Sequence, residues 1–194
     1  MLKRVLFVIL AAWGAHSWWS QRAISHAPGV IAPTIPQQIN LNGAQPFEHN
    51  GYRITPLAEF DIEARVLSRE NYWLGRETDL SPVDFMLGWG RMSDEAVVRQ
   101  IGFNQSGRFG YWETHQPPIP VREIETSAAN MHLVPADRGI ARQLDTVRRG
   151  QVVHLRGYLI RADAPDGWHW ISSLTRDDVG AGACELFWVS EVRD

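Results

Sequence analysis

The sequence predicts an α+β domain built from a mostly antiparallel sheet with two or three short helices. Apolar and polar residues alternate over 60–66 and again over 152–160, apolar residues recur at helical spacing over 137–148, and glycine and proline mark the turns between such segments. A chain of 194 residues, 44% hydrophobic and 21% charged, is long enough for one globular domain. We therefore expect a single domain over residues 51–194.

The first 19 residues predict a membrane anchor or a signal segment. Two basic residues precede an apolar run over 5–15, and Trp18 and Trp19 follow where the run meets polar sequence. The short run favours a cleaved signal peptide, whereas the tryptophans favour a retained anchor at the membrane interface. We expect residues 2–19 to form a single membrane span, with the amino end in the cytoplasm and the domain on the other side of the membrane. The alternatives are export followed by cleavage of the segment, and a buried or amphipathic helix of a cytosolic protein.

Residues 20–50 predict an extended linker. They carry four prolines, a pair of glutamines and three asparagines, and no helical or alternating pattern runs through them. Such a segment would hold the domain away from the membrane. The alternative is an irregular strand packed on the side of the domain.

The first part of the domain predicts a strand and then two helices. The alternation over 60–66 is typical of a strand with one solvated face. Ser81, followed by proline and then an acid, predicts the start of a short helix over 82–87. A second helix is expected to begin at residues 93–95 and to end before Gly102.

The second half of the domain has the clearest local signals. Residues 103–113 predict a hairpin, residues 137–148 a helix, and residues 152–160 a strand that contains a glycine. Further strands are expected over 168–172 and 184–192. A strand interrupted by glycine that enters an antiparallel meander favours a small OB-like or SH3-like barrel in this C-terminal part.

The composition narrows the classes of function. With 19 basic and 22 acidic residues the formal net charge is −3, and no stretch is strongly basic, so we expect no nucleic-acid partner. The single cysteine allows neither an internal disulfide nor a zinc site of several cysteines. No pair of histidines has the compact spacing of a metal motif, and we expect neither a metal nor another cofactor.

Cys184 is the candidate nucleophile. It follows the small residues 180–183, which let a backbone approach a ligand and present amide hydrogens to it. A thiol nucleophile needs a base, which His132 together with Asn130, or His169, can supply. The alternative is that Cys184 is a small buried hydrophobic residue that opens a strand.

Trp168, Trp170 and the loop that follows them are the candidate ligand-binding residues. Because they are two apart on one expected strand, the two indoles point to the same face, where they can stack on sugar rings or contact acyl and headgroup surfaces. Arg176, Asp177 and Asp178 in the adjoining loop would complete this site. The alternative is that the two tryptophans are core residues of a small barrel.

Several short strings taken together resemble those of a family of uncharacterised proteobacterial proteins with a short amino-terminal hydrophobic segment. The strings are 65–69 with Tyr72, 81–84, 88–90 with 92–94, 105–108, 129–133 with 135–136, 167–170 with 172–176, and 180–185. The resemblance covers most of residues 51–190 and implies a bacterial envelope setting. In that setting the span over residues 2–19 would lie in the bacterial inner membrane with the domain in the periplasm, or the domain would be secreted to the periplasm after cleavage. It implies no activity, and no catalytic residue follows from it.

These observations predict a membrane-tethered periplasmic domain that binds an envelope component, either a glycan or a lipid headgroup, or a partner protein. The prediction depends on the expected tether, on the acidic domain and on the absence of a convincing catalytic set in the sequence. The alternative is a thiol-dependent hydrolase or acyltransferase that uses Cys184 with a histidine base.

Overall fold

The computed structural model describes residues 22–175 and 184–193. Within them lie three short α-helices and two 3-10 turns: α2 Glu95–Val98, α3 Val121–Thr126, α4 Arg138–Thr146, η1 Arg76–Asp79 and η2 Gly90–Ser93. The strands are β1 Gln37–Asn40, β2 Phe47–His49, β3 Tyr52–Asn71, β4 Val83–Gly88, β5 Gly102–Ser106, β6 Phe109–Glu113, β7 Ala128–Pro135, β8 Val152–Asp163, β9 His169–Ile171 and β10 Glu185–Arg193. This content of mostly antiparallel strands with three short helices confirms the expected fold class.

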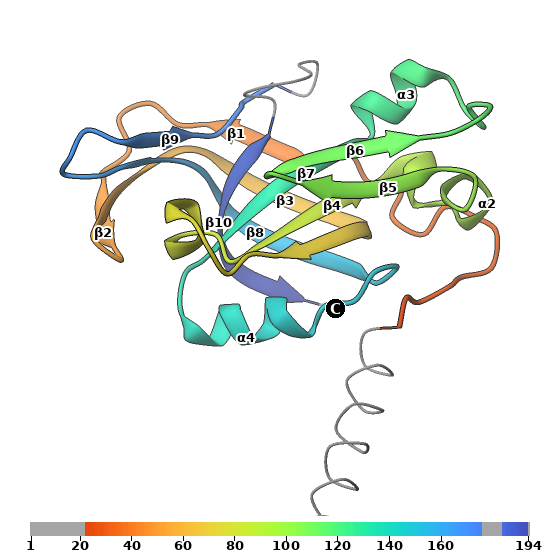
Figure 1. Cartoon of the computed structure of the whole chain (residues 1–194). Coiled ribbons are helices and arrows are strands. Elements are labelled where there is room, and N and C mark those ends of the chain that lie inside the picture. The colour runs from red at the N-terminus through yellow and green to blue at the C-terminus, as the bar shows by residue number, and fades with distance from the viewer. Residues whose placement is uncertain (1–21, 176–183, 194) are drawn as a thin grey trace, which may run out of the picture.

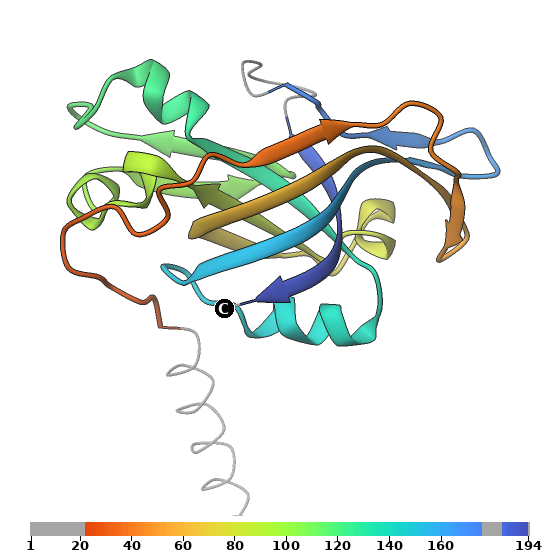
Figure 2. The same cartoon turned by 180° about the vertical axis from the view of Figure 1, so that it is seen from behind.

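Five of the strands close into a barrel (Figures 1 and 2). The pairs run β3–β4, β4–β7, β7–β10, β10–β8 and β8–β3, and only β7–β10 is parallel among them. Helix α4 connects the third barrel strand, β7, to the fourth, β8. This strand order, with its single parallel pair and its helix, is the connectivity of an OB-fold barrel. The C-terminal strands β8 and β10 thus belong to an OB-like barrel, and β3, β4 and β7 from earlier in the domain complete it.

The alternating pattern of β3 builds the interior of the barrel. Phe60, Ile62 and Ala64 are almost fully buried and belong to one apolar cluster with residues of the other barrel strands. The rings of Phe60 and Phe187 meet edge to face, with their centroids 5.2 Å apart. Burial of such side chains stabilises the fold by roughly 25 cal/mol per Å² of apolar surface. Two further apolar clusters cover the outside of the barrel, one around Trp188 and one under the β5–β6 hairpin.

The expectation of an extended linker over 20–50 is wrong for the described residues of that segment. Strand β1 pairs with β3 through Gln37 and Asp61, and β2 pairs with β3 through Phe47 and Ile54. Ala32 is fully buried. The segment is thus part of the domain, in agreement with the alternative of a packed irregular strand. The expected membrane anchor over 1–19 lies outside the described residues, and no helix within those residues is long and apolar enough to cross a membrane.

The expected helix over 82–87 is in fact strand β4. All six residues of β4 are buried, and the strand is paired on both sides, with β3 and with β7. The Ser81 hydroxyl donates to the Val83 carbonyl and to Asp84 instead of capping a helix. The paired barrel therefore overrides the local signal for a helix start.

Most of the other expected elements are confirmed. Asp94 caps α2 by accepting from the amide of Ala96, and Asp137 caps α4 by accepting from the amides of Gly139 and Ile140. The β5–β6 hairpin, β8, β9 and β10 form close to where the sequence predicts them. No expectation covered α3 or β7, and β7 carries two of the candidate site residues, as described below.

Candidate functional site

A cavity of about 410 Å³ lies outside the barrel, between the loop 72–82 that follows β3, the turn of the β5–β6 hairpin, strand β7 and strand β9. Its lining is Glu77, Gly107, Arg108, Phe109, His132, His169, Trp170, Ile171 and Cys184. Four residues that the sequence singled out for chemistry therefore share one cavity: His132, His169, Trp170 and Cys184. We call it the Trp170 cavity.

A buried aspartate and histidine lie beneath this cavity. Asp84 on β4 and His132 on β7 are directly opposite each other in the strand register. Both point away from the barrel interior, because the residues on either side of each belong to the interior cluster: Val83 and Phe85 on β4, and Met131 and Leu133 on β7. Asp84 Oδ2 and His132 Nδ1 lie 2.9 Å apart and are both buried, although the angle is not that of a hydrogen bond. With Nδ1 directed at Asp84, Nε2 is the ring nitrogen of His132 that remains for a ligand.

Arg108 reaches the same aspartate from the tip of the hairpin. Gly107 and Arg108 have φ values of 57° and 72°, so Arg108 holds a left-handed conformation that is strained for a side chain other than glycine. Its Nη1 lies 2.9 Å from Asp84 Oδ1 and donates to the Ser81 carbonyl, while Nη2 donates to the Thr78 hydroxyl. These contacts compensate for the strain at the turn and fix the hairpin tip on the cavity wall.

Two aromatic rings pack against the guanidinium of Arg108. It lies 3.7 Å from the centroid of the Tyr72 ring and 5.8 Å from that of Trp170. Burial and then the negative charge of Asp84 raise the pKa of Tyr72 to about 12. Tyr72 is thus a neutral phenol at physiological pH, and it presents a flat surface to the cation.

Cys184 and Asn130 are brought together, as the nucleophile hypothesis requires. The Asn130 side-chain amide lies 3.6 Å from Cys184 Sγ and donates to the Arg108 carbonyl, while its oxygen accepts from Gln105. Cys184 is half-buried, so it is neither a fully buried hydrophobic residue nor a freely exposed thiol. His132 and His169 line the same cavity as the thiol.

The two tryptophans of the candidate binding site lie on one side of β9, as expected. Their ring centroids are 6.2 Å apart and both side chains are half-buried. Trp170 lines the cavity and packs on the His132 ring at 4.7 Å, whereas Trp168 packs on Tyr52. Neither belongs to the barrel interior, because both pack against the cluster on the outside. His169, the residue between the two tryptophans, also lines the cavity.

An ion pair ties together two loops near the cavity. Arg76 of the loop 72–82 makes two hydrogen bonds, of 2.7 and 2.9 Å, to the carboxylate of Asp166, which follows β8. These bonds lower the pKa of Asp166 to about 2, and the Arg76 guanidinium also lies 4.8 Å from the Trp168 ring centroid. Arg176, Asp177 and Asp178, the other expected ligand-binding residues, lie outside the described residues.

Sequence reasoning missed Asp84, Arg108, Tyr72 and Glu77. Two signals could have revealed part of this set. Asp84 is the one charged residue in an otherwise apolar run over 82–87, and Arg108 directly follows the glycine of an expected tight turn. A single charged residue in an apolar run is expected to be buried, and a buried charge is unfavourable unless it has a partner of opposite charge.

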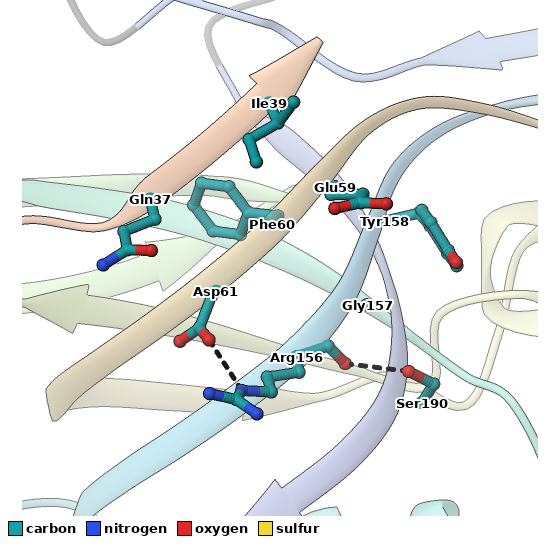
Figure 3. Close-up of a pocket in the computed structure, with 9 residues that line it drawn as sticks. All are labelled: Gln37, Ile39, Glu59, Phe60, Asp61, Arg156, Gly157, Tyr158 and Ser190. Atoms are coloured by element: carbon teal, nitrogen blue, oxygen red, sulfur yellow. Dashed lines mark hydrogen bonds and ion pairs between the residues drawn. The ribbon is translucent and has the colours of Figure 1, made fainter. Parts of the chain in front are cut away.

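A second cavity, of about 310 Å³, is lined by residues of β1, β3, β8 and β10 (Figure 3). Of the three charged side chains that line it, Glu59, Asp61 and Arg156, the last two already form an ion pair. Asp61 lies 2.6 Å from both Arg156 and His154, and Ser190 donates to the Arg156 carbonyl. Its charges therefore make this cavity a weaker candidate for ligand recognition than the Trp170 cavity.

No group of three or more His, Cys, Asp or Glu side chains within residues 22–175 and 184–193 is arranged to hold a metal ion. A scan against protein-family models, a search of curated proteins and a search of solved structures find no match to this chain.

Proposed function

We propose that this chain is a glycan-binding module of the bacterial envelope, tethered to the inner membrane, that holds a sugar unit in the Trp170 cavity. The observation that carries the proposal is the lining of the cavity, in which the Trp170 indole lies beside both hydrogen-bond donors and hydrogen-bond acceptors. Glu77 offers acceptors, Arg108 donors, and His132 either role.

A sugar suits such a lining better than the other envelope components. Its C–H face stacks on an indole, and its hydroxyl groups need donors and acceptors in a confined space. A lipid phosphate needs a surplus of positive charge, whereas the charge of Arg108 is already balanced by Asp84 at 2.9 Å. The loop between the first two barrel strands and the connection between the last two also form the oligosaccharide-binding region of OB-fold proteins, an analogy at the level of the fold.

The test is a titration of the folded protein with oligomers of N-acetylglucosamine, read out by tryptophan fluorescence and calorimetry. Trp170→Ala should weaken binding at least tenfold, about 1.4 kcal/mol. Trp73→Ala is the matched control, because Trp73 is 83% exposed and does not line this cavity. Equal affinity in Trp170→Ala and wild type would overturn the assignment of the site. Binding of glycerol 3-phosphate in place of sugars would overturn the assignment of the ligand.

A thiol-dependent hydrolase or acyltransferase is the second candidate, favoured by the shared cavity of Cys184 and two histidines. In this reading Cys184 is the nucleophile, His132 held by Asp84 or alternatively His169 is the base, and the Asn130 amide lies beside the sulfur. Alkylation of the folded protein by iodoacetamide, with Cys184→Ser as the blank, separates the two candidates. A rapid reaction that persists at pH 6 supports the enzyme, and a rate no higher than that of a free thiol excludes it.

A further inference from the structure

An apolar groove of about 450 Å³ lies between the loop 72–82 and helix α4, apart from the Trp170 cavity. Tyr72, Trp73, Pro82 and Val83 line it from the loop and β4, and Ala141 and Arg142 line it from α4. None of these six residues lines the Trp170 cavity. The groove is therefore a separate surface feature.

Two consecutive large apolar side chains stand exposed beside this groove. Trp73 is 83% exposed and Leu74 is 89% exposed, the highest values among the large hydrophobic residues that the structure describes. A tryptophan and a leucine together at a loop tip are unfavourable in water, and they are typical of segments that enter the interface of a bilayer.

Positive charge predominates on the α4 side of the groove, where Arg142 and Asp145 are the charged residues of the lining. Residues 137–149, which include α4, carry four arginines and two aspartates in a chain whose net charge is −3. Arg138, Arg142 and Arg149 are exposed. One of the aspartates, Asp145, lies 3.7 Å from Arg69, so its charge is already offset. An acidic protein thus presents a local cationic face, which complements anionic headgroups.

The start of the described chain lies on this side of the molecule. In Figures 1 and 2, α4 and the segment that begins at Arg22 are at one end of the domain, while α3 is at the other. The apolar run over 5–15 precedes Arg22 in the sequence. Insertion of that run into a bilayer would bring the α4 end of the domain next to the lipid.

We infer that this face rests on an anionic lipid bilayer, and we define it as the α4 face: Trp73, Leu74, Arg138, Arg142, Arg149 and the groove. Trp73 and Leu74 enter the headgroup region and the arginines contact lipid phosphates. The domain is thereby held in one orientation, with the Trp170 cavity near the membrane surface on the other side of the loop 72–82. The inference concerns orientation, and it does not depend on what the cavity binds.

The test places a nitroxide label at position 74 of the full chain. Leu74→Cys is made together with Cys184→Ser, and the chain is mixed with vesicles of phosphatidylcholine alone or with one quarter phosphatidylglycerol. Power-saturation EPR then compares collisions of the label with oxygen and with a water-soluble nickel chelate. We expect the label at position 74 to collide with oxygen and to be protected from the nickel chelate, and we expect this only in the anionic vesicles. A label at Val121→Cys on α3, where the native residue is 44% exposed, is the matched control and should stay open to nickel in both.

Charge reversal gives the second arm. Arg138→Glu with Arg142→Glu should restore nickel access at position 74 at least severalfold, while the chain stays with the vesicles through its apolar segment. If the label at position 74 is open to nickel in anionic vesicles, the inference is overturned. It is also overturned if the label is protected from nickel to the same extent before and after charge reversal. Protection from nickel without any vesicles would show contact with a second copy, and would overturn it as well. Glycan titration of the wild-type chain, which keeps Cys184 in the cavity, is read out by calorimetry and shows separately whether the proposed function stands.

Discussion

Arg108 Nη1 lies 2.9 Å from Asp84 Oδ1, and this pair joins the tip of the β5–β6 hairpin to the barrel. Asp84 is fully buried, and the Arg108 side chain is 16% exposed. Since the same guanidinium stacks on Tyr72 and lines the Trp170 cavity, one ion pair sets the relative positions of the hairpin, a loop and β4. The position of the cavity wall therefore depends on this ion pair.

Replacement of Asp84 by asparagine should therefore be costly. Asp84→Asn leaves the charge of Arg108 without its partner in a mostly buried position, and we expect the free energy of unfolding to fall by about 3 kcal/mol. Urea denaturation followed by circular dichroism measures this change. Glu123→Gln removes an exposed partner of Arg91 and should cost less than about 1 kcal/mol. Similar values for the two variants would contradict the structural role given to Asp84.

Gly110 on β6 permits the close approach of the hairpin to the barrel. A Cβ atom there would lie 2.9 Å from Asn130 Cβ and 3.0 Å from Met86 Sδ, so Gly110→Ala must push β6 outward. We expect a loss of about 1–3 kcal/mol in unfolding free energy. Because the Asn130 amide contacts Cys184, faster alkylation of the thiol should accompany the loss.

Gly102, at the base of the same hairpin, provides the control for this variant. A Cβ at Gly102 would meet only the flexible side chain of Glu113, so Gly102→Ala should be milder and leave the thiol unchanged. Equal effects of the two substitutions would show that the approach at Gly110 is not critical.

Elements with a strong local signal could be predicted from the sequence. Apolar alternation predicted the centre of β3 and most of β8, and helical spacing after Asp137 predicted α4, because each pattern records which face of its own element is buried. Strand β4 could not be identified in this way. It is buried on both faces, so it shows no alternation, and the serine–proline–acid sequence before it imitates a helix start.

The candidate site could be predicted in its chemistry but not in its assembly. The residue types of Cys184, His132 and Trp170 marked them as candidates, yet nothing local shows that they share a cavity. Their proximity results from the closed barrel, in which β7 pairs with both β4 and β10. That register alone places His132 opposite Asp84, 48 positions earlier in the sequence. Strand pairing over such separations depends on the whole fold.

His49 should make stability depend on pH below neutrality. Burial, which includes an edge contact with the Trp188 ring at 4.5 Å, lowers the pKa of His49 below its usual 6.5. The unfolded chain therefore binds the proton more readily than the folded one, and stability falls as the pH drops below about 6.5. Urea midpoints at pH 7.5 and 5.5 should differ less in His49→Gln than in wild type. An unchanged difference would show that this histidine does not contribute.

The Arg76–Asp166 pair should respond at much lower pH. Hydrogen bonds from Arg76 lower the pKa of Asp166 from 3.8 to about 2, so the stabilising effect of the pair is fully present above 3.8 and is lost as the pH falls towards 2. The carboxyl carbon of Asp166, followed by NMR, should titrate near 2 in wild type, and its pKa should rise towards 3.8 in Arg76→Gln, where the Trp168 amide still lowers it. Asp163 is the internal control, because Arg161 lowers its pKa independently of Arg76. If Asp166 keeps its low pKa without Arg76, the ion pair is not its main cause, and the hydrogen bond from the Trp168 amide within the same turn is the first contact to examine.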